Sequence, residues 1–108
     1  MVTSKEYLEY ILDWLSGVEG ITYRSMMGEY IIYCNGRILA YVCDDRFLVK
    51  LVKAAERLMP DAVHEPPYDG AKPMSLVENT DDREFMKKLV EEVYDELPLP
   101  KKKKKLSN

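Results

Sequence analysis

The dipeptide Asn35-Gly36 constrains the fold of this chain more than any other feature of the sequence. It lies between two apolar runs, Tyr30–Cys34 and Arg37–Cys43. Asn and Gly both tolerate a positive φ, which the tightest hairpin turns require, so this dipeptide between two such runs is the strongest short-range signal for a β-hairpin. We therefore predict two adjacent antiparallel strands joined by a two-residue turn.

The expected turn also determines which side chains share a face of the hairpin. One face carries Tyr30, Ile32, Cys34, Arg37, Leu39 and Tyr41, and the other carries Ile31, Tyr33, Ile38, Ala40 and Val42. Both faces are apolar, whereas helices cover only one face of the sheet in a two-layer domain. Two interpretations follow. Either the uncovered face contacts a partner or a second copy of the chain, or it is closed by further helices or by curling of the sheet.

Apolar residues at helical spacing predict three helices. Their starts and ends carry the usual signals, which are a capping-box pattern, acidic residues in the first turn, or a proline just past the end. The first expected helix spans residues 4–16 and follows the capping-box pair Thr3 and Glu6. The second spans residues 52–59 and ends before Pro60. The third has about 16 residues, begins at the cap segment Asn79–Asp82 and stops at Pro98 and Pro100.

Strands are expected in three further places, where β-branched and aromatic residues follow turn residues. The first strand is Ile21–Met26, and a fourth strand, Arg46–Lys50, follows the hairpin after a second turn. Segment 61–69 is expected to be a loop. A fifth strand is expected near Ala71–Val77, and Pro73 within it predicts either an edge position or a late start, because proline cannot donate to the strand ladder.

The order of these elements predicts a two-layer α+β fold. A helix, four strands, a helix, a strand and a helix follow one another with mostly short connections, which favours a mainly antiparallel sheet of about five strands packed on three helices. With 108 residues the chain holds one domain, expected over residues 1–100. Residues 101–108 are expected to form a disordered lysine-rich tail.

Charge is distributed unevenly along the chain. The formal net charge is −3, but the tail supplies five of the 16 basic residues, which leaves 11 basic against 19 acidic residues and a charge of −8 on residues 1–100. An acidic body repels phosphate, so duplex DNA is not expected to bind the folded part. The tail is expected to bind nucleic acid weakly or to act only as a solubility tail; its basic residues are Lys101, Lys102, Lys103, Lys104 and Lys105.

No segment predicts a membrane span or a secretory signal. The longest apolar run, Ile38–Cys43, has six residues, whereas a membrane-spanning helix needs about 20. The start of the chain lacks the basic residues, apolar stretch and cleavage site of a signal peptide. We therefore expect a cytoplasmic protein that does not contact membranes.

Cys34 and Cys43 are expected to be reduced, buried and roughly 20 Å apart in the hairpin register, beyond disulfide reach.

The sequence offers little catalytic or metal-binding chemistry. His64 and the two cysteines are scattered, without the spacing of a zinc site. The sequence has no nucleophile elbow, phosphate-binding loop or dinucleotide-binding turn. Acidic pairs such as Asp44-Asp45 and Glu91-Glu92 are better explained as a turn and a solvated helix face than as acid/base dyads. We expect a protein that is not an enzyme and holds no cofactor or metal.

Three segments together resemble the TfoX/Sxy N-terminal domain family, and in particular its short, stand-alone members with a lysine-rich tail. They are residues 24–37, 44–50 and 68–74, and the resemblance covers about residues 4–100. In the family the first motif usually runs Arg-x-Met-Phe-Gly-Gly-x-Gly-Ile-Tyr. The matching residues are Arg24, Met26, Gly28 and Tyr33, then Asp44, Asp45 and Lys50, then Gly70, Lys72, Pro73 and Met74, whereas Met27, Glu29 and Ile31 replace residues usual in the family.

This resemblance implies a fold similar to the type III secretion chaperone class. It also implies kinship with regulators of natural competence, which act alongside a cyclic-AMP-dependent transcription activator. Those regulators have a further, helical C-terminal domain, so the role of a full regulator is not carried over to this chain.

Two functions agree with these features. The first is a non-enzymatic, regulatory interaction domain that binds a protein, such as a transcription regulator, or a second copy of the chain. Its expected partner-binding residues are Arg24, Met27, Gly28, Tyr30, Tyr33, Tyr41, Asp44, Asp45, Lys50, Gly70, Pro73 and Met74. The alternative is a small-molecule-binding or catalytic site, which requires convergence in one pocket of Arg24, Tyr33, Asp44, Lys50 and Tyr68. Arg24 also has a structural interpretation, as an ion pair with the Asp44-Asp45 turn.

Overall fold

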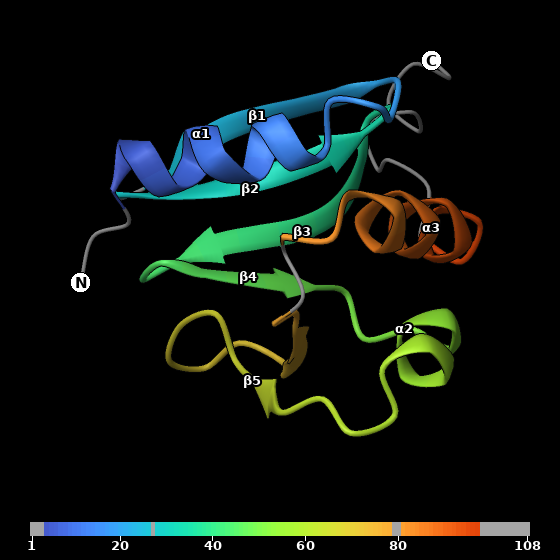
Figure 1. The fold of residues 1–108 in the computed structure, drawn as a ribbon. Coiled ribbons are helices and arrows are strands. Elements are labelled where there is room, and N and C mark those ends of the chain that lie inside the picture. The colour runs from blue at the N-terminus through green and yellow to red at the C-terminus, as the bar shows by residue number, and fades with distance from the viewer. Residues whose placement is uncertain (1–3, 27, 79–80, 98–108) are drawn as a thin grey trace, which may run out of the picture.

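The computed structural model describes residues 4–26, 28–78 and 81–97 of the chain. These residues form three helices and a six-stranded antiparallel sheet, so the predicted α+β fold is confirmed, with six strands in place of about five (Figure 1). The strands lie in the order β1-β2-β3-β4-β6-β5. The helices are α1 (Lys5–Trp14), α2 (Lys53–Leu58) and α3 (Arg83–Tyr94), and the strands are β1 (Ile21–Met26), β2 (Glu29–Cys34), β3 (Arg37–Cys43), β4 (Arg46–Val49), β5 (His64–Glu65) and β6 (Met74–Leu76).

Helices α1 and α3 begin at polar caps. The Ser4 hydroxyl accepts a hydrogen bond from the backbone N–H of Tyr7 (3.1 Å), and the Asp82 carboxylate accepts one from that of Phe85 (3.0 Å). These bonds satisfy N–H groups that have no partner within the helix. Ser4 therefore caps α1, in place of the expected capping box. The other predicted cap, stop and tail residues lie outside the described residues: Thr3, Asn79, Thr80, Pro98, Pro100 and Lys101–Lys105.

The three helices cover one face of the sheet. Helix α1 lies along β1 and β2, whereas α3 packs against β3 and α2 (Figure 1). Their apolar faces bury a continuous core against the strands, and burial of this apolar surface stabilises the fold. The core includes Leu8, Ile11, Leu15, Ile32, Ala40, Val42, Phe47, Val49, Ala54, Ala55, Met86, Leu89, Val90 and Val93. None of the helices in the described ranges has the length and apolar character that crossing a membrane requires.

The predicted hairpin is confirmed at its turn but its register changes further along. Asn35 and Gly36 have φ values of 50° and 84°, and Cys34 pairs with Arg37 as expected. The register then shifts between Ile32 and Tyr33. Beyond this β-bulge the pairs are Ile32 with Ala40, Ile31 with Tyr41, and Tyr30 with Val42, which corrects the predicted register and face.

The bulge has a physical reason in the packing of the core. Leu39 and Ala40 are consecutive, and both are fully buried in the helix-covered core. Regular alternation would send one of them to the opposite face, whereas a bulge inserts one extra residue and keeps both inside. As a consequence Tyr30 and Tyr41, which were expected to share a face, lie on opposite faces of the sheet.

The last two strands differ from expectation. Segment 61–69 was expected to be a loop, but His64–Glu65 forms the short edge strand β5 and pairs with Ser75 and Met74. Two residues are too few to show the alternation that predicts a strand. Strand β6 begins late, after Pro73, which was one of the two alternatives. It is not an edge strand, because it lies between β4 and β5.

The sheet face opposite the helices, which we call the second face, is partly covered by a loop. This face carries Tyr41 and Leu48, which pair with each other in β3 and β4. The loop between β5 and β6 folds over them, so that Pro67 is buried and the ring centroid of Tyr68 lies 6.2 Å from that of Tyr41. Leu48 and Met74 are buried although no helix covers them. Part of this face is therefore covered by a loop, rather than by further helices or by curling of the sheet, and part of it stays open to solvent.

Candidate functional site

A groove on the second face gathers several residues that the sequence analysis singled out. It has a volume of about 540 Å³ and is open to solvent. Its walls come from β3, from the end of β4 and from the loop that leads into β6. The lining residues are Tyr41, Lys50, Leu51, Val52, Pro67, Tyr68, Ala71, Lys72, Pro73 and Met74. We call this feature the Tyr41–Tyr68 groove.

Strand pairing brings the two walls of the groove together. Val49 in β4 pairs with Ser75 in β6, which brings the neighbouring residues Lys50 and Met74, just past this pair, to the same groove. The Lys50 backbone N–H donates to the Leu39 carbonyl oxygen (3.0 Å), which holds this end of β4 against the bulged strand. Two segments more than 20 positions apart in the sequence therefore face each other across the groove.

A turn in the loop places Tyr68 over Tyr41. The Ala71 N–H donates to the Tyr68 carbonyl oxygen (3.1 Å), and Gly70 between them has a φ of 89°, a conformation that residues with a Cβ rarely adopt. The two rings are tilted by 55°, and Tyr68 remains 50% exposed. Burial raises the pKa of Tyr41, and the neighbouring Tyr68, with which it shares a side-chain hydrogen bond, raises it further. The raised pKa keeps the Tyr41 hydroxyl protonated at neutral pH.

Among the residues that the structure describes, the only charged side chains that line the groove are two lysines. Lys50 is half-buried and Lys72 is exposed, and no acidic residue lines the groove. The ion pairs among the described residues involve Arg46, Arg57 and Arg83, so neither lysine is neutralised by a carboxylate of the described chain. The groove is thus a positively charged site on a body whose net charge is −8.

The structure brings some of the expected site residues together and separates others. Tyr41, Lys50, Pro73 and Met74 line the groove, as does Tyr68 from the alternative set. Arg24 and Tyr33 lie on the second face by register, because they pair with Ile31 and Thr22, but they do not line the groove. Five further expected residues lie elsewhere in the described chain: Tyr30 on the helix-covered face, Gly28 in the β1–β2 turn, Asp44 and Asp45 in the β3–β4 turn, and Gly70 in the loop before β6. Met27 lies outside the described residues.

The Asp44-Asp45 turn has a structural role in the described chain. Asp44 and Asp45 have φ values of 54° and 56°, and the Asp45 carboxylate accepts a hydrogen bond from the backbone N–H of Ser4 (3.1 Å). The turn therefore anchors the start of α1. The expected ion pair with Arg24 is not found, because no ion pair between described residues includes Arg24.

Five groove residues were not among the expected site residues. They are Leu51, Val52, Pro67, Ala71 and Lys72. Lys72 belongs to the third family motif, so the resemblance was a signal that could have found it. Leu51 and Val52 carried no such signal, because Leu51 follows the predicted strand, Val52 begins the predicted helix, and both lie outside the three motif segments.

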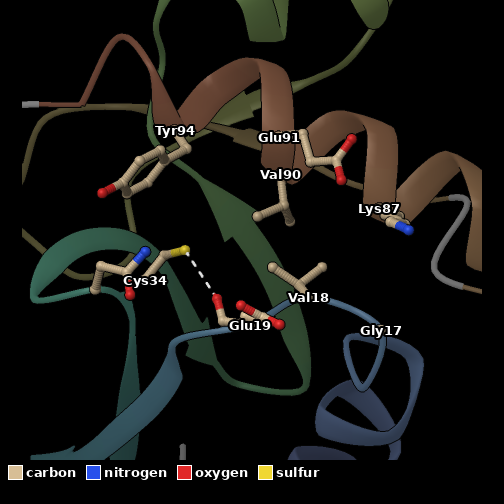
Figure 2. Close-up of a pocket in the computed structure, with 9 residues that line it drawn as sticks. Gly17, Val18, Glu19, Cys34, Lys87, Val90, Glu91 and Tyr94 are labelled. Atoms are coloured by element: carbon tan, nitrogen blue, oxygen red, sulfur yellow. Dashed lines mark hydrogen bonds between the residues drawn. The ribbon is translucent and has the colours of Figure 1, made fainter.

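A second cavity of about 390 Å³ lies between α3 and the α1–β1 connection. Figure 2 shows Val90 of α3 facing Val18 across it and Tyr94 on the side of Cys34, with Lys87 and Glu91 on the same helix. The Cys34 thiol donates a weak hydrogen bond to the carbonyl oxygen of Glu19 (3.8 Å). Burial raises the pKa of Cys34, and nearby Arg37 only partly offsets this effect. A protonated thiol that serves as a hydrogen-bond donor is a poor nucleophile.

The second cysteine is still less suited to chemistry. Cys43 is buried, and burial together with a hydrogen bond to Glu29 raises its pKa to about 12. Neither cysteine forms a disulfide. Across the described ranges, no group of three or more His, Cys, Asp and Glu side chains has the arrangement of a metal site.

The fold and the groove define a small α+β domain with an open, positively charged groove on the sheet face that the helices leave uncovered. The chain belongs to the TfoX N-terminal domain family, whose model matches residues 13–97. It is also similar to a protein of Spirochaeta aurantia described as "Uncharacterized 12.7 kDa protein in trpE 5'region". The two are 25% identical over 105 residues, which cover 96% of this chain and 91% of the relative. No solved structure shows significant similarity.

Proposed function

We propose that this chain is a non-enzymatic interaction domain that binds a protein partner through the Tyr41–Tyr68 groove. The observation that carries the proposal is that β4–β6 pairing joins residues of two family motifs, Lys50 and the segment Tyr68–Met74, into one open groove. Aromatic and apolar side chains that remain partly exposed beside a few charges are typical of protein-binding surfaces. By its kinship with competence regulators, a transcription regulator is the kind of partner we propose.

The chemistry of the described residues supports binding over catalysis. Both thiols have raised pKa values, and burial is the main cause in each. His64 lies on β5 and does not line the groove. The groove lining thus supplies lysine, tyrosine and apolar groups without a paired nucleophile and base.

A small-molecule site is the second candidate, and the volume of the groove favours it. About 540 Å³ falls within the range of roughly 300–1,000 Å³ usual for ligand pockets. However, only Lys50 and Tyr68 of the five residues in that hypothesis meet in the groove. The open wall formed by half-exposed Tyr68 also suits a protein segment better than an enclosed ligand.

A pull-down from a native lysate with the full tagged chain tests the proposal. We compare the wild-type chain with Tyr68→Asp, which alters the groove, and with Tyr23→Asp, which alters a similarly exposed tyrosine on β1 (50% and 46% exposed). A partner that is captured by wild type and Tyr23→Asp, resists nuclease and is lost with Tyr68→Asp supports the proposal. Capture that survives Tyr68→Asp, or that disappears with nuclease, overturns it.

A further inference from the structure

We infer that the partner segment held by the Tyr41–Tyr68 groove is an acidic peptide that inserts an apolar side chain between Tyr68 and Met74. This inference rests on the proposed function and adds the chemistry of the partner. It combines the charge of the groove, the character of its walls and the charge of the surrounding body.

The first step is the charge of the groove. Lys50 follows β4 and Lys72 lies in the loop that leads into β6, so the two lysines line the groove from two different segments of the chain. None of the described residues that line the groove is acidic, and no ion pair within the described chain involves either lysine. A ligand that binds in the groove gains most if it carries negative charge, because charges across an interface are arranged to be complementary.

The second step is the apolar part of the lining. Tyr68 is half-exposed, and Pro73, Val52 and the buried Met74 complete the surface. Methionine and tyrosine adapt to apolar groups of different shape and are enriched at binding surfaces. Two lysines alone would hold any anion, whereas this lining also favours an apolar side chain next to the acidic groups.

The third step excludes a long polyanion. The body around the groove carries a charge of −8, and Asp69 lies in the same loop as Tyr68. Nucleic acid presents a charge every few ångströms and would bring many phosphates against this acidic surface. A short peptide segment places its few acidic groups at the two lysines and avoids the rest of the body.

An NMR titration of the full ¹⁵N-labelled chain tests the inference. The probe is a five-residue peptide with phenylalanine at its centre and two acidic residues on each side. The control peptides replace the four acids by Asn and Gln, or the phenylalanine by alanine. We expect the acidic phenylalanine peptide to shift the amides of Lys50 and of residues 68–74, and to bind at least about tenfold more tightly than either control peptide.

Matched charge variants separate the groove lysines from general charge. The double variant Lys50→Gln/Lys72→Gln is compared with Lys87→Gln/Lys88→Gln, which removes the same charge from exposed positions of α3. We expect the groove variant to bind the peptide about tenfold more weakly and the α3 variant to bind within about twofold of wild type. Circular dichroism is the control that checks whether both variants are folded.

Four outcomes overturn the inference. They are equal binding of the neutral peptide, equal binding of the alanine peptide, shifts that map outside the groove, and the same shifts with inorganic phosphate alone. If these occur while Tyr68→Asp still abolishes capture of the protein partner, the acidic-segment inference fails and the proposed function stands. If Tyr68→Asp leaves capture intact, the proposed function itself fails.

Discussion

The Glu96 carboxylate accepts a hydrogen bond of 2.9 Å from the backbone N–H of Ala54 and so caps helix α2 from a position 42 residues away. The N-cap residue of α2, Val52, offers no side-chain acceptor. An unpaired N–H in the first turn of a partly buried helix costs stability, so the acceptor has to come from elsewhere in the fold. A residue just after α3 therefore supports α2, the helix whose N-cap residue lines the groove.

Removal of this cap should destabilise the domain. We expect Glu96→Ala to lower the free energy of unfolding by about 1 kcal/mol, in the range measured for lost N-caps, and Glu96→Gln to lose less because its amide oxygen still accepts. Urea denaturation followed by circular dichroism measures the effect. Glu91→Ala, on the exposed face of α3, is the control. Equal stability of Glu96→Ala and Glu91→Ala would contradict the capping role.

Arg37 is expected to contribute more to stability than an exposed ion pair. Its guanidinium donates to the Tyr94 carbonyl oxygen at the end of α3 (3.2 Å) and stacks over the Tyr94 ring at 4.5 Å from the centroid. We expect Arg37→Ala to cost about 1–2 kcal/mol. Arg57→Ala, which breaks the exposed pair with Glu92, should cost less than about 1 kcal/mol. Thermal and urea unfolding rank the two variants, and a larger loss for Arg57→Ala would refute this ranking.

Gly20 is expected to be intolerant of a side chain. Its φ is 84°, and a Cβ at this position would collide with the side chain of Asn35. The backbone N–H of Asn35 donates to the Gly20 carbonyl oxygen (2.9 Å), which holds the two residues together. Gly20→Ala should therefore cost about 1–2 kcal/mol, from the left-handed backbone alone, and more from the collision. Gly17→Ala meets nothing within 4 Å and serves as control. A Gly20→Ala chain as stable as Gly17→Ala would show that the hairpin turn moves freely.

Cys43 should be the less reactive of the two thiols. With a pKa of about 12, less than about one molecule in 10,000 carries the thiolate at pH 7.5. We expect the Cys34→Ala chain, which retains Cys43, to react with a thiol reagent only after unfolding. The Cys43→Ala chain retains Cys34, which borders a cavity and lies near Arg37, and should react faster. Rapid native labelling of Cys43 would mean that this part of the sheet opens readily.

Two raised pKa values predict loss of stability in alkali. Burial raises the pKa of Tyr7 from 10.0 and that of Cys43 from 9.0, each to about 12. The folded state binds these protons more tightly than the unfolded state does. The contribution of the two groups to the free energy of unfolding is therefore fully present below about pH 9 and is lost as the pH rises towards 12. Urea midpoints at pH 8 and pH 10.5 measure the loss. In the double variant Tyr7→Phe/Cys43→Ala the midpoint should depend less on pH, and an unchanged dependence would assign it to other groups.

Local signals account for the parts of the fold that were predicted correctly. The Asn35-Gly36 turn, strand Ile21–Met26 and the helix preceded by Asp82 each depend on residues within a few positions of one another. Turn conformation and amphipathic periodicity are properties of such short windows. For the same reason the sequence was sufficient to place the chain in its family and fold class.

The candidate site was predicted only in part. Lys50, Pro73 and Met74 were predicted as partner-binding residues because they belong to family motifs. No feature of the sequence predicted that they would line one groove with Tyr41. Arg24 was named on the same grounds and lies outside it. Which motif residues converge depends on the β4–β6 pairing, and that pairing joins segments separated by a helix and a loop.

By itself the sequence determined the hairpin turn, most of the elements, the two-layer class and the acidic body, because each follows from neighbouring residues or from composition. Only the tertiary structure decided that Leu39 and Ala40 would both enter the core, which moved Tyr41 to the face opposite Tyr30. It also decided that the loop carrying Tyr68 would close over Tyr41, and that Glu96 would cap a distant helix. Packing of a shared core and pairing of distant strands set these relationships, and no short window of the sequence contains both partners.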